Sequence, residues 1–248
     1  MINAGLIGYP LKHSASADLF ENIFRQENIS GIHYNLFPLK KLSSLPELIL
    51  NHPRLIGLNV TTPFKTEVVN YLDDLDQQAR QTKAVNTIEV NRDQGEIYLK
   101  GHNTDIKGFE RMMQLTGINF QPAIILGSGG AAKAVEYVLK KHDQPYIMVS
   151  RNRAKGDLTY HDIHQEHIRH FPLIIQCTPC GMYPETGKMP PFPVKYLSRK
   201  NRVIDLIYNP PETKFLQQAR LQGAATINGW IMLKEQALAS WQLWKKNL

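Results

Sequence analysis

The sequence contains only two cysteines in 248 residues, which excludes a disulfide framework and indicates a reducing compartment. It also lacks any run near the ~18 apolar residues of a membrane-spanning helix. Residues 1–5 show neither the basic region nor the apolar core of a secretion signal. We therefore expect a cytoplasmic protein with no membrane partner.

The chain has no basic arm or stripe of the kind that binds nucleic acid. Its formal charge is +7, but lysine and arginine are spread along the chain, and the longest basic clusters are 199–202 and 245–246. Anionic substrates and an anionic cofactor account for such a charge equally well. We expect no nucleic-acid partner.

The first hundred residues predict an α/β unit. Short apolar runs predict strands at 2–7, 32–37 and 55–60, and helical patterns predict helices at 15–26, from about 44, and from Pro63 to about 72. Two alternating segments, 86–90 and 96–99, flank the turn-rich residues 91–95 and predict a β-hairpin.

The stretch 123–139 predicts a strand, a tight turn and a helix. Small residues follow the pattern G-x-G-x-x-A, with Ala132 in the last place. This pattern is typical of loops that hold a pyrophosphate at a helix N-terminus. The candidate cofactor-binding residues here are Gly127, Ser128, Gly129, Gly130 and Ala131. The alternative is a glycine-rich turn in an ordinary βαβ unit.

The second half predicts a doubly wound, Rossmann-type dinucleotide domain. A connecting helix at 105–115 precedes the glycine loop, and short apolar strands are expected at 146–149, 173–177, 203–207 and 225–227. The last helix, from 230 to about 245, has an apolar stripe and is expected to pack back on the first domain. The predicted domains are 1–101 with 230–248 for substrate and catalysis, and 102–229 for the dinucleotide.

A pair of cysteines and a repeat of histidines have spacings seen in thiol or metal sites, but their surroundings in the sequence argue against both kinds of site. Cys177 and Cys180 have redox-motif spacing, yet they follow a strand without a helix to lower a thiol pKa. Four histidines recur at every third residue, and on a helix each step turns by about 60°, so they cannot share one face. They are His161, His164, His167 and His170. We expect a solvated polar segment there and no metal site.

Several separated motifs together resemble the shikimate dehydrogenase family over nearly the whole chain. They are Gly8-Tyr9-Pro10, His13-Ser14-Ala15-Ser16, Asn59-Val60-Thr61-Thr62-Pro63-Phe64-Lys65, Ala84-Val85-Asn86-Thr87, Gly101-His102-Asn103-Thr104-Asp105, the glycine loop, Asp205 with Tyr208-Asn209-Pro210, and Gly229-Trp230-Ile231-Met232-Leu233 with Gln236. The resemblance implies reversible, NADP-dependent reduction of 3-dehydroshikimate to shikimate in aromatic amino acid biosynthesis. It also implies an active site in the cleft between the two domains.

The resemblance assigns catalysis to Lys65 and Asp105. Hydride delivery to a carbonyl carbon leaves charge on the oxygen, which requires a proton donor. Lys65 would lie near the start of the helix predicted from Pro63, where the helix dipole disfavours extra positive charge and helps a lysine to give a proton. Asp105, also at a predicted helix start, would hold the lysine and bind the reacting hydroxyl.

The resemblance also implies a set of substrate contacts. These are Ser14, Ser16, Thr61, Asn86, Tyr208 and Gln236. Ser14 and Ser16 would share a substrate carboxylate, although serines in this position are also common helix caps. The chain departs from the family pattern at Ala17, where proline is usual, at Lys83, where glycine is usual, and in a shortened segment between Arg153 and Phe171.

The cofactor is expected to be NADP. An NAD enzyme usually places an acidic residue at the end of the second strand of the dinucleotide domain, whereas residues 150–155 are Ser-Arg-Asn-Arg-Ala-Lys. Arg151 would meet a 2′-phosphate, and the alternative is a basic surface turn. By resemblance, the other cofactor contacts are Ser150, Asn152, Thr178, Gly229 and Met232.

Two other functions remain open at this point. One is a quinate and shikimate dehydrogenase that uses NAD. The other is a non-catalytic relative that binds a nucleotide or a shikimate-like ligand, which the presence of both Lys65 and Asp105 argues against. The protein is expected to be a monomer or a homodimer.

Overall fold

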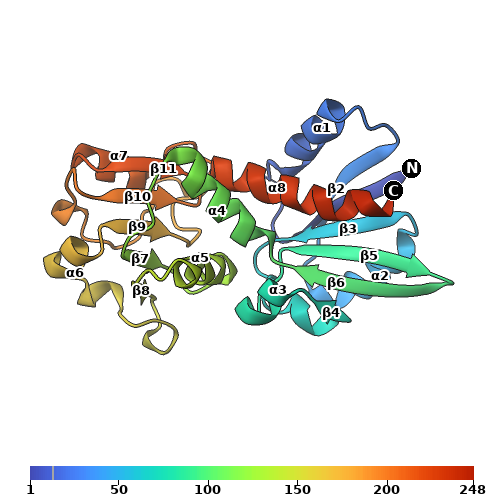
Figure 1. Cartoon of the computed structure of the whole chain (residues 1–248), viewed down its shortest axis with the longest axis horizontal. Coiled ribbons are helices and arrows are strands. Elements are labelled where there is room, and N and C mark those ends of the chain that lie inside the picture. The colour runs from blue at the N-terminus through green and yellow to red at the C-terminus, as the bar shows by residue number, and fades with distance from the viewer. Residues whose placement is uncertain (13) are drawn as a thin grey trace. The chain divides into compact units, whose positions relative to one another are not determined.

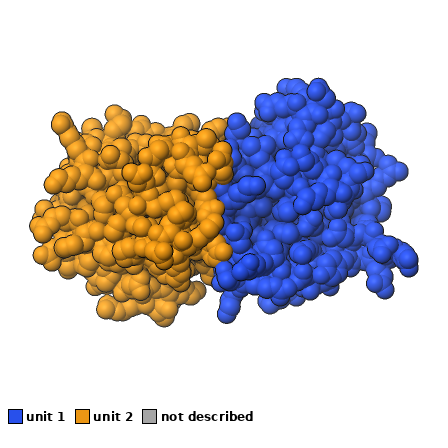
Figure 2. All heavy atoms as spheres, in the orientation of Figure 1, with its two compact units in different colours: residues 1–108, 234–248 blue, residues 109–233 orange. Residues whose placement is uncertain are grey.

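The computed structural model describes every residue of the chain except His13, and the prediction for that residue lies outside the described part. The chain divides into two compact units, residues 1–108 with 234–248 and residues 109–233 (Figures 1 and 2). The chain crosses from one unit to the other twice, and both boundaries fall inside helices, in α4 (Thr104–Thr116) and in α8 (Trp230–Trp244). The predicted domain bounds stop before these helices.

The first unit contains a mixed sheet. Its elements are β1 (Ile2–Gly8), α1 (Ser16–Gln26), β2 (Ile32–Pro38), α2 (Leu45–Asn51), β3 (Leu55–Val60), β4 (Asp74–Leu75), α3 (Gln77–Thr82), β5 (Thr87–Asp93) and β6 (Glu96–His102). In the described part of the chain the strand order is β2-β1-β3-β5-β6-β4. β1 pairs in parallel with β2 and β3, whereas β5 runs antiparallel to both β3 and β6.

The predicted hairpin is present and longer than expected. Its strands, β5 and β6, pair from Thr87 with His102 to Asp93 with Glu96. The two turn residues, Gln94 and Gly95, both have positive φ, at 47° and 90°. This is the backbone of a type I′ turn, whose twist matches that of the strands, so pairing continues up to the turn.

The last helix, α8, packs on the first unit as predicted. The indole Nε1 of Trp244 donates to the carbonyl of Ile88 at 3.0 Å, and its ring occupies the space where a side chain at Gly57 would lie. The Trp241 ring meets Phe24 edge-on, with 5.1 Å between ring centres. Both tryptophans are fully buried, which explains why this apolar helix is stable in water.

The second unit has the predicted doubly wound sheet. Its elements are the end of α4, β7 (Ala123–Leu126), α5 (Gly130–Lys141), β8 (Tyr146–Val149), α6 (Gln165–His170), β9 (Leu173–Gln176), β10 (Arg202–Asp205), α7 (Lys214–Leu221) and β11 (Ala225–Asn228). The strand order is β11-β10-β9-β7-β8 and every pairing is parallel. Alternate strand residues such as Ile124 and Ile174 pack against α6 and α7, in a core that also contains Ile168 and Phe215.

The helix predicted from Pro63 to about residue 72 is wrong. Residues 62–67 form successive turns, and only Val68–Tyr71 forms a short 3₁₀ helix. The carbonyl of Lys65 accepts the backbone N–H of Val85 at 2.7 Å, so it is not available to a helix. Long-range pairing has overridden the local helical signal, and the helix-dipole argument for Lys65 does not apply.

Three further helices, α3, α6 and α7, were not predicted; α6 lies in the histidine segment that was expected to be a solvated polar stretch. Of these, α3 and α7 begin at caps with short polar side chains: Asp76 accepts the N–H of Ala79, and Thr213 accepts the N–H of Leu216. These are the short polar residues that favour helix starts, and they were the signal available in the sequence. Of the helices in the described part of the chain, none is long and apolar enough to cross a membrane.

Candidate active site

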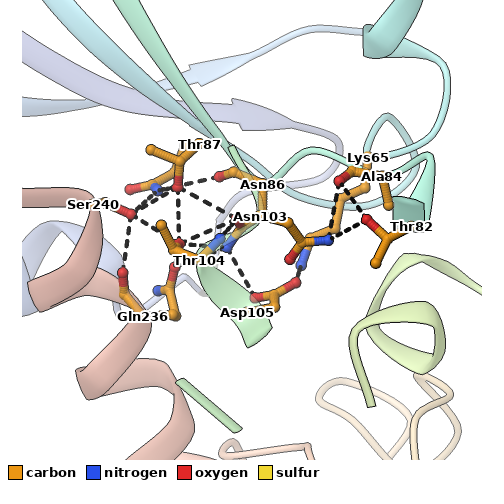
Figure 3. A network of polar contacts seen from close by, with 11 residues as sticks. Lys65, Thr82, Ala84, Asn86, Thr87, Asn103, Thr104, Asp105, Gln236 and Ser240 are labelled. Atoms are coloured by element: carbon orange, nitrogen blue, oxygen red, sulfur yellow. Dashed lines mark hydrogen bonds and ion pairs between the residues drawn. The ribbon is translucent and has the colours of Figure 1, made fainter. Parts of the chain in front are cut away.

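Lys65 and Asp105 form a direct ion pair in the first unit (Figure 3). The Nζ of Lys65 donates to Oδ2 of Asp105 at 2.6 Å, and their side chains are 20% and 7% exposed. Lys65 comes from the turns after β3, and Asp105 comes from the first turn of α4. The fold thus joins two residues 40 positions apart into one acid–base pair.

Asn86 orients the carboxylate of this pair. Its Nδ2 lies 2.9 Å from the second oxygen of Asp105 and 3.2 Å from Oε1 of Gln236 on α8. Its own Oδ1 accepts the backbone N–H of Thr104 at 2.6 Å. Asn86 is 2% exposed, so its amide is held by protein groups and not by solvent. Asp105 therefore has little freedom to rotate.

A buried polar network extends from Asn86 toward α8. Asn59 donates to Ser240 at 2.9 Å, and Thr87 and Thr104 lie 2.8 and 3.1 Å from the same hydroxyl. Figure 3 shows Ser240 and Gln236 on one helix, facing Thr87 and Thr104. Asn59, Thr104 and Ser240 were absent from the predicted site. Asn59 and Thr104 belong to the motifs that carry the family resemblance, and Ser240 follows Gln236 by one helical turn, which were the available signals.

The other predicted substrate contacts of the first unit are Ser14, Ser16 and Thr61. The hydroxyl of Ser14 accepts the backbone N–H of Ser16 at 3.2 Å in a local turn before α1; the N-cap of this helix is Ala15, so no side chain caps it. Thr61 donates its backbone N–H to Ile7, and its methyl lies where a side chain at Gly8 would be. A role for these three in substrate binding stays a prediction.

His102 holds two carboxylates next to the site. Its ring nitrogens lie 3.0 Å from Asp76 and 2.5 Å from Glu89, and its side chain is 9% exposed. Burial lowers the pKa of His102, but the hydrogen bonds and charges of Asp76 and Glu89 raise it more, to about 9. His102 is therefore a buried cation at pH 7, which sequence reasoning did not identify.

The glycine loop of the second unit has the backbone of a phosphate cradle. Gly127 has φ of +113°, and a side chain there would meet Thr178 at 2.8 Å. Gly129 is the N-cap of α5, with open space where its side chain would be. Gly130 and Ala131 form the first turn of this 12-residue helix, so their N–H groups are free of helical bonds. Its role in binding the cofactor stays a prediction.

The predicted 2′-phosphate residues follow β8 at the same carboxyl edge of the sheet as the glycine loop. Ser150 lies 3.3 Å from Ser128 and accepts the N–H of Asn152. Arg151 is exposed, whereas Arg153 lies 3.5 Å from the carboxylate of Asp162. Lys155 of the same segment is exposed as well, so a role for Arg151 at the 2′-phosphate stays a prediction.

The remaining predicted contacts also lie at the carboxyl ends of strands in the second unit. Thr178 bonds to Gln176, and Gly229 is packed so tightly that a side chain would meet the carbonyl oxygen of Leu206 at 2.0 Å. Met232 is buried, and the ring of Tyr208 lies edge-on to that of Trp230, 6.4 Å between centres. Ligands of open parallel sheets bind at this edge.

The cysteine and histidine patterns do not form a second site. Burial raises the pKa of the Cys180 thiol, which is the opposite of what a reactive thiolate requires. His161, His164 and His170 are exposed, and His167 accepts the backbone N–H of His164. Apart from the undescribed His13, the chain has no group of three or more His, Cys, Asp or Glu side chains placed to hold a metal ion.

Comparison with known proteins gives one consistent family. Residues 6–88 match the family model of the shikimate dehydrogenase substrate binding domain. A shikimate dehydrogenase (NADP+) of Clostridium perfringens is 34% identical over 97% of this chain and 91% of its own.

Solved structures agree over nearly the whole chain. A Thermus thermophilus shikimate 5-dehydrogenase in complex with NADP(H) and shikimate has a TM-score of 0.87 at 26% identity, covering 99% of this chain and 94% of that one. A quinate dehydrogenase of Corynebacterium glutamicum in complex with NAD has a TM-score of 0.84 at 27% identity, with the same coverage of both chains. The similarity therefore includes both units.

Proposed function

Because the chain belongs to the shikimate dehydrogenase family, we propose that it catalyses the NADP-dependent, reversible reduction of 3-dehydroshikimate to shikimate. The observation that carries this proposal is the Lys65–Asp105 pair, 2.6 Å apart and largely buried. A non-catalytic relative that only binds a ligand has no need of a buried acid–base pair, which costs desolvation energy.

Lys65 and Asp105 divide the proton chemistry. NADPH, when bound, supplies the hydride that adds to the carbonyl carbon. The developing charge on the oxygen is met by the ammonium of Lys65, which gives up one proton as the hydroxyl forms. Asp105 holds that ammonium and accepts a hydrogen bond from the reacting hydroxyl. In the reverse direction neutral Lys65 removes the hydroxyl proton.

Asn86 and Gln236 contribute substrate recognition. Both side chains are buried and bonded to each other at 3.2 Å, next to Asp105, so their amides are oriented before a ligand binds. We propose that Ser14, Ser16 and Thr61, and Tyr208 of the second unit, supply the remaining contacts to ring hydroxyls and carboxylate.

The residues of the second unit suit NADP. The cradle of Gly127–Ala131 at the N-terminus of α5 fits a pyrophosphate, and Arg151 fits the 2′-phosphate. Ser150, Asn152, Thr178, Gly229 and Met232 complete the proposed cofactor contacts. Residues 150–155 contain no carboxylate to bind the ribose hydroxyls of NAD.

Steady-state turnover tests the proposal. Shikimate and quinate are each assayed with NADP and with NAD, and shikimate with NADP is expected to have the highest kcat/KM. A preference for quinate with NAD would assign the chain to the other activity. Turnover with none of the four pairs, from protein that binds shikimate in calorimetry, would identify a ligand-binding relative.

A further inference from the structure

We infer that Ser240 is a positioning residue for substrate binding: its buried hydroxyl fixes the turn of α8 that carries Gln236 against Asn86. This inference rests on the proposed function, because it concerns the binding of shikimate. Ser240 itself is 0% exposed and need not touch substrate.

The hydroxyl of Ser240 joins three segments that are distant in sequence. It lies 2.9 Å from Asn59 on β3, 2.8 Å from Thr87 on β5 and 3.1 Å from Thr104 on α4. It also donates to the backbone carbonyl of Gln236 at 3.0 Å. One oxygen therefore ties α8 to the elements that carry Asn86 and Asp105 (Figure 3).

One assignment of hydrogens satisfies this cluster. A serine hydroxyl has one hydrogen and two lone pairs. If the hydrogen goes to the Gln236 carbonyl, the lone pairs accept from Asn59 and Thr87. Thr104 then donates to Oδ1 of Asn86 at 3.1 Å, and Asn86 donates to Asp105. Ser240 is thus fully used, and its removal takes away the shortest contacts of the Asn59 Nδ2 and the Thr87 hydroxyl, which then have only the longer contacts to Asn86, Thr87 and Thr104.

The cluster helps to set the rotation of α8 about its axis at Gln236, one to two turns before the buried Trp241 and Trp244 that also pack this helix. Gln236 precedes Ser240 by four residues, so the two side chains lie on the same helix face. The Oε1 of Gln236 is 3.2 Å from Asn86 and 3.5 Å from Thr104, and the side chain of Gln236 is 8% exposed. A small rotation of α8 would break both contacts, because hydrogen bonds weaken steeply beyond this distance.

Ser240→Ala is expected to raise KM for shikimate about tenfold, the loss of roughly one buried hydrogen bond, with kcat and KM for NADP changed less than about twofold. Ser240→Cys keeps a side chain of similar size with a weaker donor, so its KM for shikimate is expected to lie between those of the wild type and Ser240→Ala. In a Gln236→Ala background, Ser240→Ala is expected to add less than about twofold.

The matched control is Asn201→Ala in the second unit. Asn201 is also buried, and it bonds to Ser198, Ile168 and Pro172, away from every proposed contact. It is expected to lower Tm without changing KM for shikimate. A folded Ser240→Ala enzyme with unchanged KM, or an equal rise in KM with and without Gln236, would overturn the inference.

Ser240→Cys provides the same comparison if the alanine variant does not fold. If the wild type is active and the Ser240 variant has the same KM for shikimate, this inference is refuted and the proposed function stands. Wild type without turnover or shikimate binding refutes the proposed function, and this inference with it.

Discussion

The two units build their sites in different ways. The glycine loop of the second unit is one contiguous stretch, and the groups proposed to bind the pyrophosphate are backbone N–H groups at the start of α5. The pair in the first unit comes from Lys65 and Asp105, and it is oriented by Asn86 and by Gln236 of α8. A backbone site depends on local conformation, whereas a side-chain site depends on the packing of several distant segments.

The cores differ in the same sense. Strands β7, β9 and β10 of the second unit are buried and apolar in their middles, with buried polar side chains only where β9 and β10 end, at Gln176 and Asp205. The first unit buries amides and hydroxyls between β3, β5, α4 and α8, and nearly all of them are paired; the oxygen of Asn103 is the exception among the described side chains. Buried polar groups are costly unless bonded, so we expect single substitutions to have larger functional effects in the first unit.

The largest expected effect is on the acid–base pair. Lys65→Ala is expected to lower kcat by about two to four powers of ten, the usual contribution of a positioned acid or base, with NADP binding unchanged. Asp105→Asn is also expected to be slow, and the double variant is expected to lose much less than the product of the two effects. Steady-state and cofactor-binding measurements check this.

Lys100→Ala is the control for that experiment, because Lys100 pairs with Asp74 at 3.2 Å on the surface of the same unit. It is expected to leave kcat unchanged. A Lys65→Ala enzyme within a few fold of wild type would defeat the mechanism.

The second prediction concerns the cofactor site. Arg151→Ala is expected to raise KM for NADP about ten- to a hundredfold, because a charge-assisted bond to the 2′-phosphate is lost, while NAD use is nearly unchanged. Arg220→Ala, which removes an exposed arginine paired with Glu212, is the control. Equal effects of Arg151→Ala on both cofactors would remove Arg151 from the phosphate site.

The third prediction concerns His102, whose raised pKa makes its contribution depend on pH. Since its folded-state pKa is about 9 and its ordinary value is 6.5, its stabilisation is full below pH 6.5 and is lost as pH rises through 9. His102→Asn is expected to lower the free energy of unfolding by about 2 kcal/mol at pH 6 and by much less at pH 9.5. Denaturant titrations at both pH values measure this.

His142→Asn is the matched control, because His142 faces Glu110 at 3.6 Å on the surface of the second unit. It is expected to show little change at either pH. The same loss for His102→Asn at both pH values would show that the charge of His102 is not responsible.

The smallest expected effect compares backbone conformations. In the second unit the positive φ at position 127 is adopted by a glycine, which has no side chain to strain it. In the first unit Lys83, at the end of α3, has φ of +48° although it carries a side chain. Lys83→Gly is expected to raise the free energy of unfolding by about 0.5 kcal/mol, the relief of left-handed strain less the added entropy of the unfolded chain. Lys83→Ala, which keeps the strain, is expected to give no gain, and an equal gain would point to the lost charge.

The sequence alone determined the features that depend on local pattern. Apolar runs and turn residues predicted strands such as β1 and β7, the β5–β6 hairpin and the glycine loop, since these follow from backbone geometry and side-chain alternation. The motifs that resemble the family pointed to Lys65 and Asp105, and the basic residues after β8 indicated NADP.

Only the tertiary structure decided how side chains meet. It replaced the helix predicted from Pro63 by turns because the carbonyl of Lys65 pairs with Val85. It also placed Lys65 2.6 Å from Asp105, His102 between two carboxylates, and Ser240 against Asn59. These contacts join residues up to 181 positions apart, and they depend on strand register and on the rotation of α8, which no local pattern encodes.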